Sequence, residues 1–380
     1  MRVALFSGNY NYVREGANQA LNRLVGRGLE KGHEFRIYSP VTDTPAFEPV
    51  GDLVPVPSIP IPLRREFRLA TGLPTHLRDD VRRFAPDLIH VSTPDILGAR
   101  AQSFAKQLGV PIVTSMHTRF ETYFEHYRLG WARPMAEAHL RRFYRRSDHV
   151  LAPTLAIVEE MKQLRGDAQV SLWSRGVDRE LFDPKRRDMD WRRAQGFGDD
   201  DLVLLFFGRL VLEKGVRDYV AIVQRLRDQG LPVKPLVVGA GPADGEFRPV
   251  GGAVLTGHLD GPDLARAIAS ADILIHPSRT EAFGNVVLEA MASGLAIVSA
   301  NTDSSRQLIK SGCSGVLCSD DRHETFADAV VALQDTDARR SLGAEARNAS
   351  TRFSWDGASD SVLDEYRSVL SKASESREPS

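Results

Sequence analysis

Short apolar runs alternate with amphipathic stretches along most of this 380-residue chain. The first run, "RVALFSG" at 2–8, ends in glycine, and apolar residues then recur on one helical face from Ala17 to Leu29. Further β-rich runs follow at 34–40, 87–93, 111–117 and 149–154. Strands that alternate with helices in this way predict a parallel sheet that is covered by helices on both faces.

The second half of the chain repeats this scheme. Strand-like runs occur at 201–209, 234–241, 253–258, 272–278, 295–300 and 315–319. Turn residues cluster near 173–184, so we predict two Rossmann-like domains, 1–172 and 173–355. A helix at about 356–372 is expected to pack back on the first domain. Because ligands of such sheets bind beyond the carboxyl ends of the strands, a cleft between the domains is the expected site.

One segment departs from the alternation. Residues 50–67 contain four prolines, at positions 55, 57, 60 and 62. Proline excludes a helix interior and disfavours a central strand. We therefore expect an extended surface loop here.

Composition narrows the class of protein. The chain is 42% hydrophobic and 26% charged, with a net charge of -1, so it carries no overall basic character that would indicate nucleic-acid binding. Its two cysteines, Cys313 and Cys318, are too few for a disulfide scaffold and favour a reducing compartment. No apolar run approaches the ~18–20 residues of a membrane span, and no secretory signal is apparent. We expect a cytoplasmic protein.

Two glutamates flank an expected helix start in "RTEAFGNVVLEA" (279–290). Glu281 lies in the loop after a strand, and Glu289 lies inside a helix expected from about Asn285 to Ser293. A helix N-terminus favours an anion, and carboxylates accept hydrogen bonds from sugar or ribose hydroxyls. The alternative is that Glu281 is a solvated loop residue and Glu289 an ordinary helix former.

Two cations follow the strand in "FFGRLVLEKG" (206–215). Arg209 offers a forked donor and Lys214 a point charge, which together suit a diphosphate, although both could simply be exposed charges near a helix start. The nearby "VVGAGP" (237–242) contains no GxGxxG fingerprint, which argues against a dehydrogenase. Its Gly239 indicates at most a turn that passes close to a ligand.

The first half offers two weaker candidates. Gly16 in "REGANQAL" could let a phosphate approach the backbone at a helix start, or could be a plain helix entry. His117 closes the strand-like run "PIVTSMH" and would point at the cleft, although a lone histidine is more often structural.

These motifs resemble one family. "GRL…EKG", "VVGAGP", "SRTEAFGNVVLEAMASGLAIVSA" and "SGCSGVLC" resemble the C-terminal domain of family 4 retaining glycosyltransferases, whose GT-B fold has two Rossmann-like domains facing a central cleft. Glu281 and Glu289 match the family's E-x7-E element. "VREGANQAL", "VTSMHTRFETYF" and "LWSRGVDRELF" resemble the branch that contains glycolipid α-mannosyltransferases and sulfoquinovosyl-diacylglycerol synthases. Glu15-Gly16 stands where many relatives have Gly-Gly.

The resemblance implies a hexosyltransferase that moves a sugar, mannose rather than glucose or glucuronate, from a nucleotide-diphosphate donor to a glycolipid or lipid hydroxyl, forming an α linkage. The alternatives are the same chemistry with a UDP-sugar and a polysaccharide-precursor acceptor, a sugar-nucleotide 2-epimerase, and a sugar-nucleotide sensor without catalytic activity. No cofactor is implied, and the metal can be dispensable because Arg and Lys replace its charge.

The resemblance also assigns roles to residues. Arg209 and Lys214 would hold the diphosphate, Glu281 the sugar hydroxyls and Glu289 the ribose, with His117 beside the transferred sugar. The catalytic set is then His117, Arg209, Lys214 and Glu281, and the donor-binding set is Gly16, Gly239, Phe283, Gly284, Asn285, Val286 and Glu289.

A basic and aromatic stretch, "LRRFYRRSD" (140–148), suits an acceptor in a membrane. Each arginine near an anionic bilayer could contribute roughly 1 kcal/mol. The residues are Arg141, Arg142, Arg145 and Arg146. They could equally form a solvated helix face, so peripheral binding to the inner face of the membrane is a hypothesis.

Overall fold

The computed structural model describes residues 1–13, 15–61, 64–117, 133–319 and 322–375. The chain forms two compact units. Unit 1 begins at Met1 and ends at Arg175, and it includes the C-terminal segment from Trp355. Unit 2 comprises Gly176–Ser354.

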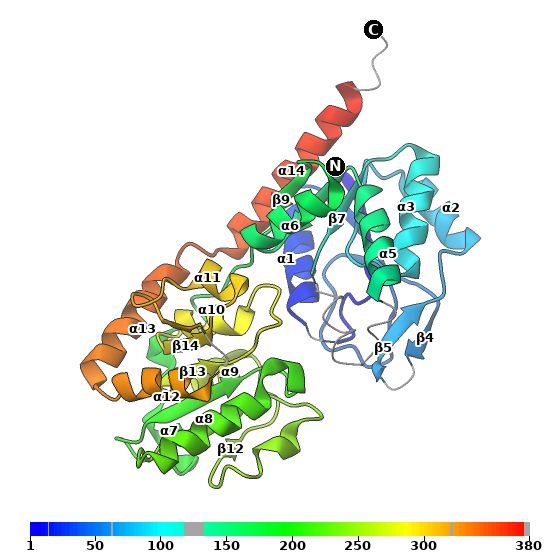
Figure 1. Cartoon of the computed structure of the whole chain (residues 1–380). Helices are drawn as coiled ribbons and strands as arrows, with labels where there is room; N and C mark the ends of the chain where they lie inside the picture. The colour runs from blue at the N-terminus through cyan, green and yellow to red at the C-terminus, as the bar shows by residue number, and fades with distance from the viewer. Residues whose placement is uncertain (14, 62–63, 118–132, 320–321, 376–380) are drawn as a thin grey trace. The chain divides into compact units, whose positions relative to one another are not determined.

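Unit 1 is built on a seven-stranded parallel sheet in the order β3-β2-β1-β6-β7-β8-β9 (Figure 1). Its central strands β6, β7 and β8 are buried along their whole length, as expected for a sheet with both faces covered. The strands are β1 (Arg2–Phe6), β2 (Glu34–Ser39), β3 (Asp52–Pro55), β6 (Leu88–Val91), β7 (Ile112–Ser115), β8 (His149–Ala152) and β9 (Val170–Leu172).

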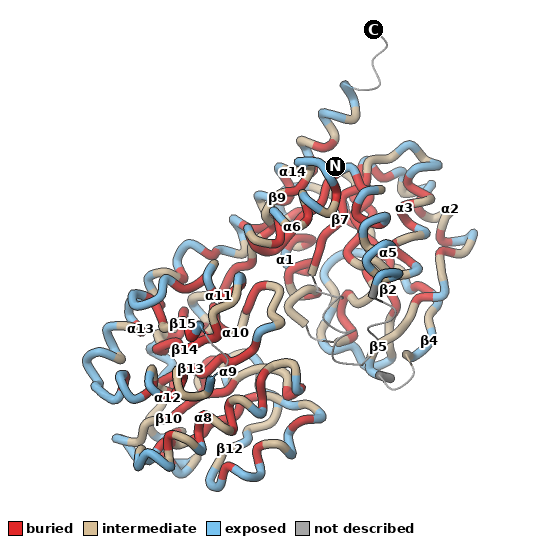
Figure 2. Tube along the Cα trace, viewed as in Figure 1, coloured by how far each residue is buried: buried red, intermediate tan, exposed pale blue. Residues whose placement is uncertain are grey.

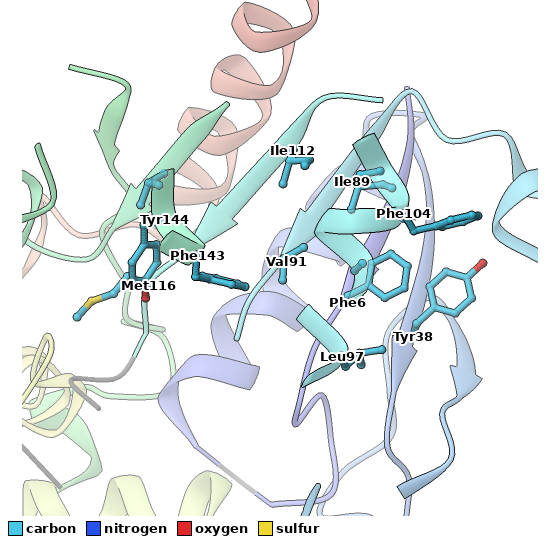
Figure 3. Close-up of a cluster of buried hydrophobic side chains, with 14 of the residues drawn as sticks. Phe6, Tyr38, Ile89, Val91, Leu97, Phe104, Ile112, Met116, Phe143 and Tyr144 are labelled. Atoms are coloured by element: carbon cyan, nitrogen blue, oxygen red, sulfur yellow. The ribbon is translucent and has the colours of Figure 1, made fainter. Parts of the chain in front are cut away.

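Helices connect these strands and cover the sheet. They are α1 (Gly16–Glu30), α2 (Thr75–Phe84), α3 (Ile96–Leu108), α5 (Arg133–Arg145), α6 (Leu155–Arg165) and α14 (Trp355–Glu375). On one face, aromatic and aliphatic side chains form a continuous core, in which the Phe6 and Tyr38 rings stack with centroids 4.8 Å apart (Figure 3). This burial gives unit 1 a hydrophobic core of its own.

Helix α14 belongs to unit 1 although it follows the whole of unit 2 in sequence. Its apolar face, with Val362, Leu363 and Tyr366, is buried in the same cluster as Leu21 and Leu24 of α1 (Figure 2). The packing places α14 against α1, as the colours of the chain's two ends make visible in Figure 1.

The expected loop at 50–67 is wrong, because most of this segment is strand. Residues Asp52–Pro55 form β3 at the edge of the sheet, and β4 (Ser58–Ile61) pairs antiparallel with β5 (Arg64–Ala70). Prolines are tolerated in these strands because an edge strand or a two-stranded hairpin leaves backbone positions that need no ladder hydrogen bond. The composition thus correctly excluded a helix and a central strand, but not strands at an edge.

Unit 2 contains a six-stranded parallel sheet in the order β12-β11-β10-β13-β14-β15, with hydrophobic clusters on both faces. Its strands are β10 (Val203–Phe207), β11 (Lys234–Val238), β12 (Val254–Leu255), β13 (Ile273–His276), β14 (Ala296–Ala300) and β15 (Val316–Cys318). The prediction of two α/β units with parallel sheets is confirmed.

The α-helices of unit 2 are α7 (Met189–Ala194), α8 (Val216–Asp228), α9 (Gly261–Ala269), α10 (Asn285–Ala292), α11 (Asp303–Leu308), α12 (His323–Ala332) and α13 (Thr336–Ser350). Short 3-10 turns lie at Pro184–Arg186, Leu212–Lys214 and Asp244–Phe247. Across the described part of both units, every helix is too short or too polar to cross a bilayer.

Candidate functional site

Three loops meet at the carboxyl edge of the unit 2 sheet. They follow β10, β11 and β13. The amide of Gly208 donates to the carbonyl of Val238 at 3.0 Å. A Cβ on Gly239 would lie 1.9 Å from the Gly208 carbonyl oxygen, and its φ of +143° also suits only glycine. A Cβ on Gly215 would lie 2.8 Å from Pro277. Glycines therefore let these backbones pack directly on one another.

An ion pair joins two of the loops. The Lys214 ammonium donates to Oε1 of Glu281 at 2.7 Å, and the Thr280 hydroxyl donates to the carbonyl of Glu213 at 3.1 Å. Nε2 of His276, at the end of β13, lies 3.5 Å from the same Glu281 oxygen. Burial alone would raise the pKa of the Glu281 carboxyl, but Lys214 and His276 outweigh it and lower that pKa below its usual range. Glu281 is therefore a fixed carboxylate.

Helix α10 begins at Asn285, four residues after Glu281. Gly284 is its N-cap with φ +98°, and the amides of Val287 and Leu288 both donate to the Gly284 carbonyl. The two amides before them, at 285 and 286, belong to the helix end that has no intrahelical acceptor. A helix end of this kind attracts an anion.

Two buried oxygens between the end of β13 and the first residue of α10 have no protein partner among the described residues. Among the described residues, Oδ1 of Asn285 and Oγ of Ser278 make no hydrogen bond. Buried polar atoms in folded proteins are nearly always satisfied, so each of these two oxygens lacks a partner that water or a ligand would have to supply. Phe283 differs from them, because its side chain is buried against Phe353 and only its backbone is available.

Glu289 lies on α10 one turn beyond its start. Burial raises the pKa of its carboxyl to about 8. At neutral pH, Glu289 is therefore mostly protonated, whereas Glu281 is charged. The two glutamates of the motif have different charge states. Lys214 offsets the effect of burial on the pKa of Glu281, whereas burial determines the pKa of Glu289.

Arg209 follows Gly208 in the loop after β10, and its carbonyl accepts from the Val211 amide at 3.0 Å. A Cβ on Gly208 would lie 3.7 Å from Cγ1 of Val286, so this loop runs beside the first turn of α10. The structure thus brings the predicted unit 2 residues to one sheet edge, with Lys214 and Glu281 in direct contact. His276, Ser278 and Thr280 were missed, although their positions at the end of a strand were the available signal.

Unit 1 holds the other two candidates. Gly16 is the first residue of α1, and the preceding Glu15 accepts a hydrogen bond from Asn9 Nδ2 at 3.2 Å, while its amide donates to Asn18 Oδ1 at 3.0 Å. A carboxylate thus stands at this helix start. Because it would repel a phosphate, the predicted phosphate contact at Gly16 carries an electrostatic cost in this chain.

His117 lies two residues beyond the end of β7, and both of its ring nitrogens have protein partners. Nδ1 accepts a hydrogen bond from Nη2 of Arg175 at 2.9 Å, and Nε2 lies 2.8 Å from Oγ of Ser115. Burial, reinforced by the Arg175 charge, lowers the pKa of His117 well below its usual value. Arg175 was missed, although it stands in the quoted "LWSRGVDRELF" segment.

The four arginines proposed to meet a membrane differ in their surroundings. Arg141 and Arg142 are exposed on α5, and Met135 on the same helix is 71% exposed. Arg145 donates to the carbonyl of Arg165 at 2.8 Å, and Arg146 donates to Ser103 at 2.8 Å. Two of the four are therefore partly engaged by the protein itself.

The amino-acid sequence matches two family profiles. Residues 14–181 match "Glycosyltransferase Family 4", and residues 201–336 match "Glycosyl transferases group 1". Together these matches include every candidate residue described above.

The relatives match most or nearly all of the chain. A GDP-mannose-dependent alpha-mannosyltransferase of Mycolicibacterium smegmatis is 32% identical over 98% of this chain and 99% of its own length. A sulfoquinovosyl transferase of Arabidopsis thaliana is 31% identical over 82% of this chain, which matches 62% of that relative. An alpha-monoglucosyldiacylglycerol synthase of Acholeplasma laidlawii is 22% identical over 83% of this chain and 84% of its own length.

Solved structures share the fold. A sucrose-phosphate synthase from Thermosynechococcus elongatus has a TM-score of 0.77, with 18% identity over 98% of this chain and 99% of that one. The Anabaena protein HepE in complex with UDP has a TM-score of 0.74, with 18% identity over 97% of this chain and 100% of its own. At this level of identity, the likeness establishes the GT-B fold alone.

Proposed function

Because the chain belongs to glycosyltransferase family 4, we propose that it transfers a hexosyl group, mannose in preference, from a nucleotide-diphosphate sugar to a hydroxyl of a glycolipid or lipid head group. The anomeric configuration is retained and an α linkage forms. The preference for mannose and for a lipid acceptor is supported by the relatives, three of which are named GDP-mannose-dependent alpha-mannosyltransferases and one an alpha-monoglucosyldiacylglycerol synthase.

The observation that carries this proposal is the Lys214–Glu281 pair beside the N-terminus of α10. Cleaving a sugar–diphosphate bond builds negative charge on the leaving group. A fixed ammonium, a guanidinium in the adjacent loop and a helix N-terminus stabilise that charge without reorganising as the bond breaks. Lys214 and Arg209 are assigned to the diphosphate, and Glu281 accepts hydrogen bonds from hydroxyls of the sugar.

The charge of the free site favours an anionic donor. Lys214 and Arg209 contribute two positive charges, and Glu281 cancels one of them. Glu289 adds little negative charge at neutral pH, because its pKa is raised to about 8. Of the two carboxyl groups that the site offers to sugar and ribose hydroxyls, mainly that of Glu281 opposes the phosphates at neutral pH.

Removal of either cation tests the assignment. One preorganised charge of this kind contributes roughly 3 kcal/mol to the transition state, so Lys214→Ala and Arg209→Ala are each expected to lower kcat by about a hundredfold. Arg217→Ala is the matched control, since Arg217 is an exposed cation of the same unit that pairs with Glu246. Near-normal turnover in both site variants would defeat the proposal.

The donor and the reaction class are tested together. Purified protein is incubated with a panel of GDP- and UDP-sugars, with and without diacylglycerol lipids, and the anomeric configuration of any product is read by NMR. Transfer from GDP-mannose to lipid with an α linkage is the expected result. An epimerised donor in the reaction without acceptor would identify an isomerase instead.

Peripheral membrane association accompanies this proposal. The exposed Arg141 and Arg142, with the exposed Met135 on the same helix, support contact with an anionic bilayer. Flotation with vesicles that contain anionic lipid should be lost when both arginines are changed to glutamate. The control is the same change at the exposed Arg82 and Arg83 of α2. Equal flotation of the two double variants would contradict the proposed membrane contact of α5.

A further inference from the structure

A chain of buried polar side chains extends behind His117 in unit 1. Oγ of Ser115 lies between two imidazoles, 2.8 Å from Nε2 of His117 and 2.7 Å from Nε2 of His90. Nδ1 of His90 in turn bonds to the hydroxyl of Tyr366 on α14. Ser115, His90 and Tyr366 are each at most 1% exposed. Their hydrogen bonds are therefore made within the protein.

Arg175 closes the other end of this chain, and its own segment holds it in place. Nη1 donates to the carbonyls of Trp173 at 2.7 Å and Ser174 at 3.2 Å, and the guanidinium lies 5.0 Å from the centroid of the Trp173 ring. The same indole also makes an edge contact with the His117 ring at 5.2 Å. Nη2 is thereby aimed at Nδ1 of His117.

The direction of this hydrogen bond fixes the tautomer of His117. A guanidinium only donates, so Nδ1 of His117 must be the unprotonated, accepting nitrogen. In a neutral imidazole the proton then resides on Nε2, which faces Ser115. A second proton could enter only at Nδ1, where it would oppose both the N–H and the positive charge of Arg175.

We propose that Arg175 is a positioning residue that holds His117 neutral, with its single proton on Nε2, so that His117 neither accepts a proton nor becomes a cation during transfer. That His117 lies beside the sugar rests on the proposed function, whereas its protonation state does not. A neutral ring is the useful form there, because an imidazolium would oppose the positive charge that develops on the anomeric carbon.

The position of Arg175 in the chain gives this contact a second consequence. Arg175 is the last residue before unit 2, and Tyr366 lies on the helix that forms after the chain returns. Both parts of unit 1, the part before unit 2 and the part after it, therefore contribute residues to the hydrogen-bonded chain behind His117. Among the described residues, two titratable or charged groups face the His117 ring. They are Arg175, which bonds to it directly, and His90, which is linked to it through Ser115.

The protonation state is tested directly by NMR on the full chain labelled with 15N-histidine. Two-bond 1H–15N correlations show which ring nitrogen carries the proton, and the His117→Gln variant identifies the signal. We expect His117 to be protonated on Nε2 alone, without titrating between about pH 5.5 and about pH 8. A wild-type His117 with its proton on Nδ1, or one that titrates in this range, would overturn the proposal.

Variants assign the effect to Arg175. In Arg175→Met, His117 should titrate or change its tautomer, whereas Arg175→Lys should keep the wild-type tautomer. Arg165→Met is the matched control, since Arg165 is a buried arginine of unit 1 that bonds to Asp167 and Ser147 instead. An unchanged signal in Arg175→Met contradicts the proposal. If Arg175→Met does not fold, Ser115→Ala provides the test. If Arg175 alone holds the His117 ring, the ring keeps its proton on Nε2 in this variant, and a changed tautomer would contradict the proposal.

Kinetics separates this inference from the function on which it rests. Arg175→Met should lower kcat by about tenfold or more, with little change in the KM of the nucleotide sugar, because Arg209, Lys214 and Glu289, which are assigned to the diphosphate and the ribose, lie in unit 2. A wild-type protein without transferase activity would refute the proposed function and leave the NMR result intact. An active enzyme in which His117 titrates would refute the role of Arg175 alone.

Discussion

The raised pKa of Glu289 predicts that nucleotide affinity depends on pH, if Glu289 binds the ribose as proposed. Burial raises that pKa to about 8, and the ribose is assigned to this carboxyl. An ionised carboxylate accepts hydrogen bonds from both ribose hydroxyls, whereas a protonated one must direct its own O–H elsewhere. Ribose binding therefore favours the ionised form, and some binding free energy is spent on removing the proton below pH 8.

The size of the effect follows from the ionised fraction. If only the carboxylate binds, Kd scales with one plus the ratio of proton concentration to the acid constant. With the pKa at about 8, this factor is about 11 at pH 7 and about 1.3 at pH 8.5. We therefore expect GDP or UDP to bind about eightfold more tightly at the higher pH. The phosphate, which ionises near pH 6, contributes little to this difference.

Isothermal titration calorimetry with GDP and UDP across this range measures the dependence. The glutamine of Glu289→Gln cannot ionise, so the Kd of this variant should be nearly independent of pH. Any pH dependence that remains in this variant measures titration of the nucleotide base, and it can be subtracted from the wild-type profile. A 2′,3′-dideoxynucleoside diphosphate should bind the wild-type protein with the same flat profile. An identical pH dependence in wild type and Glu289→Gln would show that another group titrates and that the ribose is not on Glu289.

Two further variants probe the same sheet edge. Glu281→Gln should tighten GDP or UDP binding, because the variant lacks the carboxylate that lies 2.7 Å from the Lys214 ammonium and neutralises it. The same variant should have a lower kcat for transfer. Calorimetry and turnover measured on one preparation test both expectations, and weaker nucleotide binding would contradict the reasoning. Gly239→Ala should lower the free energy of unfolding by roughly 2 kcal/mol or more, since its Cβ would overlap the Gly208 carbonyl. Gly251→Ala, which adds its Cβ in open space, is the control in urea unfolding, and equal stability of the two variants would refute the close approach.

The architecture of both units was predictable because alternation of buried strands and amphipathic helices is a local signal. A buried parallel strand such as β13 needs a continuous apolar run, and the turn after it needs glycine or proline, so both appear in the sequence. The prediction of a loop at 50–67 was wrong for the opposite reason. An edge strand has few burial requirements, so its composition resembles that of a loop.

The functional residues also differ in whether a local sequence signal could predict them. Arg209, Lys214 and Glu281 follow strand ends by two, seven and five residues. A polar side chain in such a loop has no packing role to explain it, so the sequence could single these residues out. The partners of His117 could not be found in this way. Arg175 is 58 residues away from His117, and Tyr366, which bonds to His90 behind it, is 249 residues away. These separations exceed the reach of any periodic pattern, and each residue looks like an ordinary core or turn residue. Only the fold shows that the arginine donates to Nδ1, which is the ring nitrogen where a second proton would have to enter.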